Sequence, residues 1–350
     1  MNSAAGTGKI GFEESLVTSV VKPGKCLSCG ACVTVCPFDC LEYLNAKPVL
    51  AKECKVCGIC AKVCPQYEMF LSKLEKTVFG KERTLEEEFG VYRKLLIAQA
   101  KNDRILSVCQ DGGVVTALLL FAFENGLIDS AVVSGISKEK PSLPFPKLAT
   151  TPEEILECSG TRYFYSPNIL ALAEGAKQKK EKLAFVGTPC QIRAVRKMQT
   201  AGLKKYTNSV RFLIGLMCSE CFTYEGLMEK HIRETLGLNL NDIKKINIKG
   251  KMFVTTKSNV QTISLADAKQ YVRESCRSCD DFSSELADIS VGGLGLEGWT
   301  FVIIRTKNGE DLLDAAAKAD ILRTRPVEKG EFALSLLVKL SGKKRKSASE

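Results

Sequence analysis

Cysteines in a repeated pattern are the residues of this chain best suited to chemistry. The stretch CLSCGACVTVCP (26–37) recurs as CKVCGICAKVCP (54–65), so each copy has the spacing C-x2-C-x2-C-x3-C-P. In bacterial two-cluster ferredoxins this spacing holds a pair of 4Fe-4S clusters, and the fourth cysteine of each copy crosses to the other cluster. We therefore expect two clusters with the following ligands: Cys26, Cys29, Cys32 and Cys64 for one, and Cys54, Cys57, Cys60 and Cys36 for the other.

Zinc is the alternative occupant, because it also binds four thiolates. The duplication of the whole pattern, with Pro37 and Pro65 ending the two copies, favours iron–sulfur clusters over zinc. Gly30 and Gly58 allow the tight loop that brings the first three thiolates of each copy together. Paired clusters of this kind move single electrons over short distances.

The remaining thiols lie at turns farther along the chain. Cys190 follows the strand-like run LAFV (183–186) in the turn GTPCQI, where a thiol could be a nucleophile, a metal ligand or a buried side chain. The only histidine, His231, lies in an amphipathic stretch, so no obvious base is available to activate a nucleophile. Three further thiols occupy similar turns, and the spacing alone gives no reason for them to meet Cys190: Cys218, Cys276 and Cys279. Another three are expected to be ordinary buried thiols: Cys40, Cys109 and Cys158.

Two glycine-containing stretches have the composition of nucleotide-binding loops. VCQDGGVVTALLLFAF (108–123) places two glycines before an apolar helix, whose free backbone amides suit a phosphate or pyrophosphate. A plain helix start capped by an aspartate is the alternative. GLGLEG (293–298) matches G-x-G-x-x-G in form, but it lies between two predicted strands (287–292 and 299–306) instead of opening a helix. We therefore predict a loop there and no dinucleotide fingerprint.

The elements that position these residues divide the chain into five regions. We expect a loose leader with one short helix at 1–22, the two-cluster domain at 23–70, a partly helical linker at 71–90, a large domain at 91–340, and a solvated basic tail at 341–350. In the large domain the strand-like runs AVVSGI, LAFVGT, RFLIGL and FVIIRT alternate with amphipathic helices, which predicts an α/β (α+β) fold. Docking of the tail, which contains KKRK (343–346), to an acidic partner is the alternative.

Charge and composition narrow the classes of function. The net charge of +10 favours an anionic ligand or partner, and the basic residues are interspersed with acidic ones, which argues against nucleic acid. The N-terminal stretch resembles no signal peptide, and no apolar run is long enough to cross a membrane. We expect a cytoplasmic protein, in which sixteen cysteines indicate metal ligation instead of disulfides.

Several blocks over residues 91–340 together resemble the family of beta subunits of coenzyme F420 hydrogenases and dehydrogenases. In order they are QDGGVVTALL, SGTRYFYSPN, VGTPCQIRAVRKMQ, GLMCSE, and a C-x2-C-D-D motif followed by ELADISVGGLG and GWTFVIIRT. The resemblance implies a bound FAD against which coenzyme F420 docks, and a third 4Fe-4S cluster on Cys190, Cys218, Cys276 and Cys279. Cys221 departs from the family pattern and could compete with Cys218 for the cluster.

The same resemblance implies which residues surround the flavin and its substrate. The FAD contacts implied are Gln110, Asp111, Gly112, Gly113, Thr116, Gly160, Thr161, Arg162, Tyr163, Ser166, Asn168, Gly187, Thr188, Gly293 and Gly295. Coenzyme F420 carries a phosphate and glutamyl carboxylates, so basic side chains are candidates for holding it: Arg162, Arg193, Arg196, Lys197 and Arg305.

The two-cluster domain fused to this large domain is similar to the input subunits of membrane-bound F420H2 dehydrogenases in methanogenic archaea. That similarity implies hydride transfer from reduced F420 to FAD, followed by single-electron transfer through the clusters to a partner that reduces a quinone or methanophenazine. The partner would be the other subunits of a membrane complex, onto whose inner face this chain would dock peripherally. The beta subunit of an F420-dependent formate dehydrogenase and a flavin-free iron–sulfur carrier are the alternatives.

Overall fold

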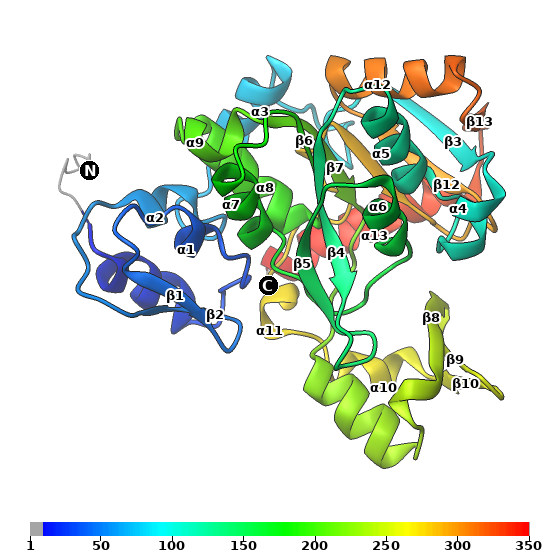
Figure 1. Cartoon of the computed structure of the whole chain (residues 1–350), viewed down its shortest axis with the longest axis horizontal. Coiled ribbons are helices and arrows are strands. Elements are labelled where there is room, and N and C mark those ends of the chain that lie inside the picture. The colour runs from blue at the N-terminus through cyan, green and yellow to red at the C-terminus, as the bar shows by residue number, and fades with distance from the viewer. Residues whose placement is uncertain (1–9, 350) are drawn as a thin grey trace.

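The computed structural model describes residues 10–349, and an eight-stranded mixed sheet forms their centre (Figure 1). The strand order is β13-β3-β12-β11-β7-β6-β4-β5. The strands are β3 (Lys94–Ala100), β4 (Ser130–Ile136), β5 (Pro144–Ala149), β6 (Leu183–Gly187), β7 (Val210–Leu216), β11 (Ile289–Gly292), β12 (Thr300–Ile304) and β13 (Leu322–Pro326). The four stretches predicted as strands form β4, β6, β7 and β12, which confirms them.

Helices cover both faces of this sheet, because residues that alternate along each strand are apolar on both sides. One face packs against α4 (Asp103–Val108), α5 (Val114–Glu124), α6 (Pro152–Glu157) and α12 (Lys307–Lys318). The opposite face packs against α7 (Ile169–Lys177), α8 (Pro189–Thr200) and α13 (Phe332–Ser349), with the short α9 (Lys204–Thr207) beside α7 and α8. Among residues 10–349, no helix combines the length and the apolar character needed to span a bilayer.

The turns that carry the chemistry gather at one edge of the sheet. Strands β4, β6, β7 and β11 run parallel, so their carboxyl ends meet at that edge, the usual place for a ligand in an α/β sheet. Strand β6 leads to Cys190, β7 leads to Cys218, and β11 leads to the loop at Gly293. Strands β11 and β12 pair antiparallel across that loop, which confirms that GLGLEG opens no helix.

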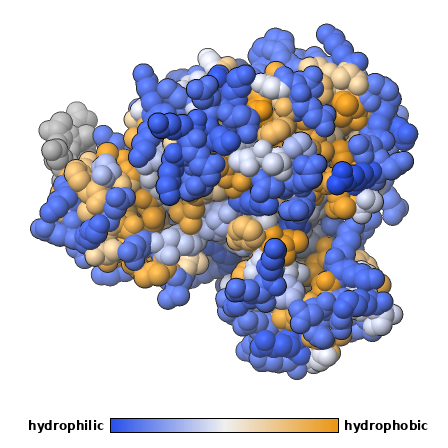
Figure 2. Space-filling view, viewed as in Figure 1, coloured by the Kyte–Doolittle hydropathy of each residue, from blue (hydrophilic) through white to orange (hydrophobic). Residues whose placement is uncertain are grey.

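A small lobe with its own core interrupts the large domain, and no sequence pattern predicted it. It holds the antiparallel strands β8 (Ile243–Lys249), β9 (Lys251–Thr256) and β10 (Val260–Ile263), the π-helix η2 (Glu225–Thr235), the 3-10 helix η3 (Leu240–Asp242) and α10 (Leu265–Lys269). Helix α11 (Glu274–Arg277) then returns to the sheet. The half-buried His231 of η2 lies beside Tyr271, with the two ring centroids 5.5 Å apart. Figure 2 shows a notch between this lobe and the sheet domain, with apolar side chains along it.

The cysteine-rich unit contains η1 (Glu13–Val21), α1 (Ala31–Thr34), the hairpin of β1 (Leu41–Leu44) and β2 (Lys47–Leu50), and α2 (Ile59–Val63). The expected leader contains its helix, but residues 10–22 are not loose: Phe12, Leu16 and Val20 are buried against Cys32 and Cys60. Residues 1–9 of that leader lie outside the described residues. The packed part of the leader therefore forms one wall of the cysteine-rich unit.

The linker and the basic tail are also packed, through both apolar contacts and ion pairs. The linker contains α3 (Leu71–Phe79), where Glu75 is buried and paired with Arg83, which in turn reaches Glu285 at 2.5 Å. The prediction of a solvated tail from residue 341 is wrong, because α13 continues through Ser349. Two of its basic side chains find partners inside the molecule: Lys344 at a backbone carbonyl, and Arg345 at Glu285.

Candidate electron-transfer site

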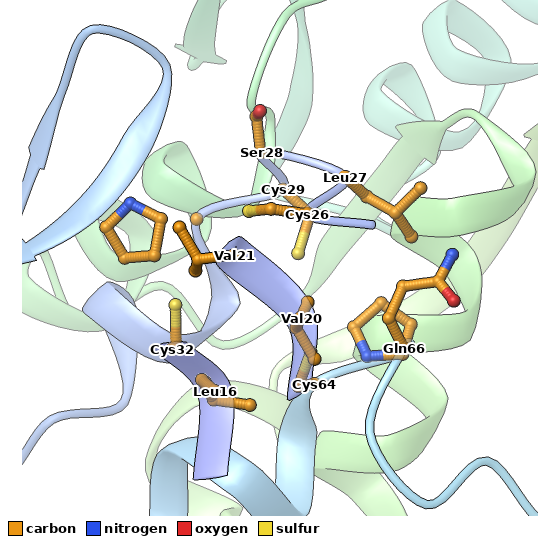
Figure 3. Close-up of a pocket in the computed structure, with 13 residues that line it drawn as sticks. Leu16, Val20, Val21, Cys26, Leu27, Ser28, Cys29, Cys32, Cys64 and Gln66 are labelled. Carbon is orange, nitrogen blue, oxygen red and sulfur yellow. The ribbon is translucent and has the colours of Figure 1, made fainter. Parts of the chain in front are cut away.

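Four cysteines of the repeated motif surround one pocket in the cysteine-rich unit. Cys26, Cys29, Cys32 and Cys64 line it together with apolar side chains such as Leu16 (Figure 3). These are the cysteines that the motif assigns to a single cluster. Gly30 precedes α1 with a φ of +80°, the left-handed conformation that a tight cysteine loop requires. The donor set and its apolar walls therefore suit a 4Fe-4S cluster.

The other four motif cysteines line a second pocket: Cys36, Cys54, Cys57 and Cys60. Cys40, expected to be an ordinary buried thiol, is buried but also lines this pocket, and its backbone N–H donates to Cys36 Sγ at 3.3 Å. Its own thiol donates to the carbonyl of Glu53 at 3.2 Å, which leaves the other four thiols facing the pocket. Within residues 10–349, no group of three or more Cys, His, Asp or Glu side chains is arranged to hold a single metal ion.

The distant cysteines meet at the carboxyl edge of the sheet. Burial raises the pKa of the Cys190 thiol, and Cys218 and Cys276 are close enough to raise it further. Cys279 likewise interacts electrostatically with Cys190. The structure therefore brings together Cys190, Cys218, Cys276 and Cys279, which we call the third thiol group. These four are the ligands that the resemblance implies for a third cluster.

Cys221 is the fifth thiol at this place. It is buried, and its side chain hydrogen-bonds with the thiols of both Cys218 and Cys276. The hydrogen bond from Cys221 lowers the pKa of Cys276 to about 6, although burial acts in the opposite direction. Cys221 thus contacts two members of the third thiol group, which makes it the alternative ligand to Cys218.

The local sequence explains how Cys190 is positioned. Thr188 begins α8 with a capping box, in which its backbone N–H donates to Gln191 Oε1 at 3.1 Å, and Pro189 occupies the first helical turn. The hydroxyl of Thr188 lies 3.2 Å from Cys190 Sγ, and the Tyr165 hydroxyl lies 3.9 Å from the same sulfur. The thiol is therefore fixed in the first turn of α8.

Arg273 joins the third thiol group to the cysteine-rich unit. Its guanidinium lies 4.1 Å from the ring centroid of Tyr165, and it donates to the carbonyl of Leu27 at 3.1 Å and to Ser28 Oγ at 2.8 Å. Leu27 and Ser28 lie between Cys26 and Cys29 in the sequence, and Cys29 interacts electrostatically with Cys190. Arg273 was not among the predicted site residues, although a basic residue three positions before Cys276 was a signal that could have found it.

A second connection fastens the cysteine-rich unit to α8. Lys197 Nζ donates to the carbonyls of Cys64 and Tyr67 at 2.7 and 2.6 Å. Thr34 adds a hydrogen bond to the carbonyl of Ile169 at 3.3 Å. Together with Arg273, these contacts hold the first cysteine pocket against the third thiol group.

The QDGG loop and the Gly293 loop are in contact beside the same edge. Gly112 has no room for a side chain, because a Cβ there would lie 2.6 Å from the carbonyl oxygen of Ala98. A Cβ on Gly293 would lie 2.5 Å from Asp111 Oδ2, so these two predicted site residues are neighbours. Gly113 takes a φ of +69° and immediately precedes α5. This confirms the predicted helix start.

Two buried nitrogens near this loop have no hydrogen-bond partner: Gln110 Nε2 and Arg162 Nε. Another nitrogen of Arg162 donates to the carbonyl of Ser159 at 2.8 Å, and the Ser159 hydroxyl lies 3.0 Å from that of Thr116. Burial lowers the pKa of Arg162, which has no carboxylate paired with it among the described residues. Unpaired buried donors call for an outside acceptor, so this part of the predicted FAD site fits an anionic, oxygen-rich ligand.

The other predicted flavin contacts occupy different surroundings. Ser166 and Asn168 are buried and satisfied, since Ser166 Oγ lies 2.6 Å from Asn168 Oδ1 and Asn168 Nδ2 donates to the carbonyl of Val186. They brace the turn after β6, which contains Gly187 and Thr188. Gly295 lies against the ring of Phe332, 3.1 Å from where its Cβ would be. The three remaining contacts surround Arg162 in sequence and are exposed or half-buried: Gly160, Thr161 and Tyr163.

Four of the five basic candidates for holding F420 have internal partners in the structure. Arg193 pairs with Asp280 and Asp281, and Arg196 pairs with Asp288. Lys197 donates to backbone carbonyls of the cysteine-rich unit. Arg305 donates to backbone carbonyls and contacts Ser283 and Ser290. Two exposed lysines of β8 that the sequence patterns did not single out interact electrostatically with Asp111: Lys245 and Lys249. Arg162 alone stays a candidate from the original set.

Comparisons with known proteins identify the family to which the chain is related. Residues 95–173 and 180–330 match the N-terminal and C-terminal parts of the family described as coenzyme F420 hydrogenase/dehydrogenase, beta subunit, and residues 19–42 match a 4Fe-4S binding domain. The coenzyme F420 hydrogenase subunit beta of Methanothermobacter thermautotrophicus is 39% identical, over 75% of this chain and 94% of that protein.

Two further relatives extend the comparison to the whole chain and to a solved structure. A subunit of the F(420)H(2) dehydrogenase of Methanosarcina mazei is 32% identical, over 95% of this chain and 93% of that protein. A chain of the F420-reducing [NiFe] hydrogenase complex from Methanosarcina barkeri superposes with a TM-score of 0.72 at 36% identity, over 76% of this chain and 93% of that one. The protein is therefore a member of the family of coenzyme F420 hydrogenase/dehydrogenase beta subunits, an F420-related oxidoreductase component with an N-terminal iron–sulfur domain.

Proposed function

We propose that this chain oxidises reduced coenzyme F420 with a bound FAD and passes the electrons singly through three 4Fe-4S clusters to a partner complex. The observation that carries the proposal is the position of the third thiol group. It lies after β6 and β7, beside the turn with Gly187 and Thr188, and Arg273 connects it to the first cysteine pocket. Such a position links a hydride-accepting site to a chain of one-electron carriers.

A bound FAD would supply the conversion of a two-electron hydride into single electrons. The protein would hold it with the unpaired donors of Gln110 and Arg162, and with the backbone amides at the start of α5 beyond Gly112 and Gly113. The β8 lysines that face Asp111 lie where the phosphate and carboxylates of F420 would be attracted.

The electrons would leave through the cysteine-rich unit in a fixed order. The third thiol group is next to the first pocket through Cys29 and Cys190, and Cys32 of that pocket interacts with Cys60 of the second one. Phe38, which lines the second pocket, is 51% exposed. An exposed apolar side chain beside the second pocket, the last carrier in this order, is suited to contact a docking partner. We propose that this partner is the remainder of a membrane-bound F420H2 dehydrogenase, which reduces a quinone or methanophenazine.

The function is tested on anaerobically purified, cofactor-loaded protein. Reduced F420 is expected to bleach the flavin absorbance band and then the broad iron–sulfur absorbance, with about twelve iron atoms per chain. Bound iron without flavin, and without any response to reduced F420, would leave only the carrier function. Co-purification from the native cell distinguishes the partners, because a molybdopterin subunit would identify a formate dehydrogenase instead.

Arg162→Met is expected to weaken FAD binding about 10- to 100-fold, because hydrogen bonds to a charged group contribute about 1.5–3 kcal/mol. The measurement is the dissociation constant of FAD, obtained by titrating flavin-depleted protein and following flavin fluorescence. Arg104→Met is the matched control, since Arg104 is exposed on the neighbouring helix α4. Equal FAD affinity in Arg162→Met and wild-type protein would remove Arg162 from the flavin site.

A further inference from the structure

The last turns of α13 lie against the third thiol group. Lys344 Nζ donates to the carbonyl of Cys276 at 3.2 Å, and the ammonium interacts electrostatically with the side chains of Cys279, Cys218 and Cys276. In Figure 1 the C-terminus lies beside α11, the helix that carries Cys276. A residue far from every cysteine motif in the sequence is therefore in contact with the candidate cluster site.

Two anchors fix this helix in place. At its C-terminal end Arg345 pairs at 2.6 Å with Glu285, whose side chain is 2% exposed and also pairs with Arg83. Nearer its N-terminal end Ala333 and Leu337 are fully buried in the core beneath the sheet. Because both ends are held, the position of Lys344 is a consequence of the fold and not of a mobile side chain reaching across the surface.

The charges around the third thiol group are unequally balanced. Arg193 faces Cys279 but is paired with Asp280 and Asp281, so acidic groups offset its charge. Arg273 also faces the group and is stacked on Tyr165. Lys344 forms no ion pair with a carboxylate among the described residues, although Glu220 is in its surroundings. Its positive charge is therefore directed mainly at the thiols.

We propose that Lys344 raises the reduction potential of the third cluster, an inference that rests on the proposed function. A cluster held by four thiolates is negatively charged, and each electron that it accepts adds one negative charge. A fixed, half-buried ammonium stabilises the reduced form more than the oxidised form. Reduced F420 gives up a hydride, which FAD would accept in the proposed function; its two electrons would then pass one at a time to the third cluster and on to the ferredoxin pair, and its proton would be released to solvent. Lys344 makes the transfer of an electron to the third cluster more favourable.

The test is a potentiometric titration of the loaded protein, followed by electron paramagnetic resonance, for wild type, Lys344→Met, Lys344→Arg and Lys343→Met. Lys343 is the matched control, because it is adjacent and exposed. In Lys344→Met the one-electron equilibrium of the third cluster is expected to shift about tenfold toward the oxidised form, equivalent to about 59 mV. Lys344→Arg and Lys343→Met are expected to keep the wild-type potential, and all four proteins are expected to keep the wild-type iron content.

Two results would overturn the proposal in different ways. An unchanged potential in Lys344→Met would show that the lysine does not tune the cluster, and loss of iron in that variant would assign it a purely structural role at the Cys276 loop. Absence of a third cluster signal from the wild-type protein is a separate result. It would refute the proposed function itself, and it is recognised by iron near eight atoms per chain, or about two thirds of the expected content.

Discussion

Replacing Cys190 with alanine is expected to remove about one third of the iron and to leave the ferredoxin pair intact. The reason is that Cys190 belongs to the third thiol group alone, whereas the eight motif cysteines line their own two pockets. A 4Fe-4S cluster that loses one of four thiolate ligands is expected to be lost or degraded. Iron analysis gives the stoichiometry, and paramagnetic resonance of the reduced protein identifies which clusters are left.

Companion variants make this experiment specific. Cys158→Ala is the control, since Cys158 is a half-buried thiol outside all three groups, and it is expected to keep all the iron. Cys218→Ala is expected to behave like Cys190→Ala, and Cys221→Ala to keep the third cluster. The reverse pattern at positions 218 and 221 would exchange their roles. Full iron content in Cys190→Ala would mean that this thiol ligates no cluster.

Arg305→Met is expected to lower the free energy of unfolding by about 3–5 kcal/mol, because it removes one partner from a buried charged network. Arg305 is 1% exposed, and its guanidinium donates to the carbonyls of Val91, Phe89 and Ser283 and to the hydroxyl of Ser290. The substitution leaves those acceptors unsatisfied and removes a charge that interacts with Glu285 and Asp281.

Chemical denaturation of the loaded protein measures this effect, together with the KM for reduced F420. Arg323→Met is the control, because Arg323 is exposed on β13 and should change stability by less than about 0.5 kcal/mol. A stable Arg305→Met protein with a raised KM would restore Arg305 as a substrate-binding residue. The expected result is the opposite: lower stability with little change in KM for the protein that stays folded.

Sequence patterns predicted the parts of the site that are formed by residues close together in the sequence. The cysteine spacing predicted which motif cysteines line each of the two pockets. A tight loop places the first three thiols of each copy around one point, and the fourth comes from the other copy. The runs of β-branched and apolar residues likewise predicted β4, β6, β7 and β12. The meeting of Cys190 with Cys276 followed from the family resemblance alone, since the chain between these distant positions has to fold first.

The failures share a different physical cause. The type of a charged residue does not reveal whether the folded chain will place an oppositely charged or hydrogen-bonding partner beside it. Arg193, Arg196, Lys197 and Arg305 were therefore candidates for holding an anionic substrate, and the structure shows them bound to buried acids and carbonyls. The tail after residue 340 was expected in solvent for the same reason, although Lys344 and Arg345 have internal partners. Internal partners therefore fix the positions of these basic side chains.

The contacts of Arg273 and Lys197 with the cysteine-rich unit have a kinetic consequence. A separate ferredoxin would have to collide with its donor, so the rate of reduction would depend on its concentration and on salt. In the proposed function the acceptor is part of the same chain and is held in place by these contacts, so the transfer from the third cluster to the ferredoxin pair would be unimolecular, equivalent to a very high local concentration. Dilution should leave the rate of that transfer unchanged, and only electron transfer to the partner complex should follow second-order kinetics.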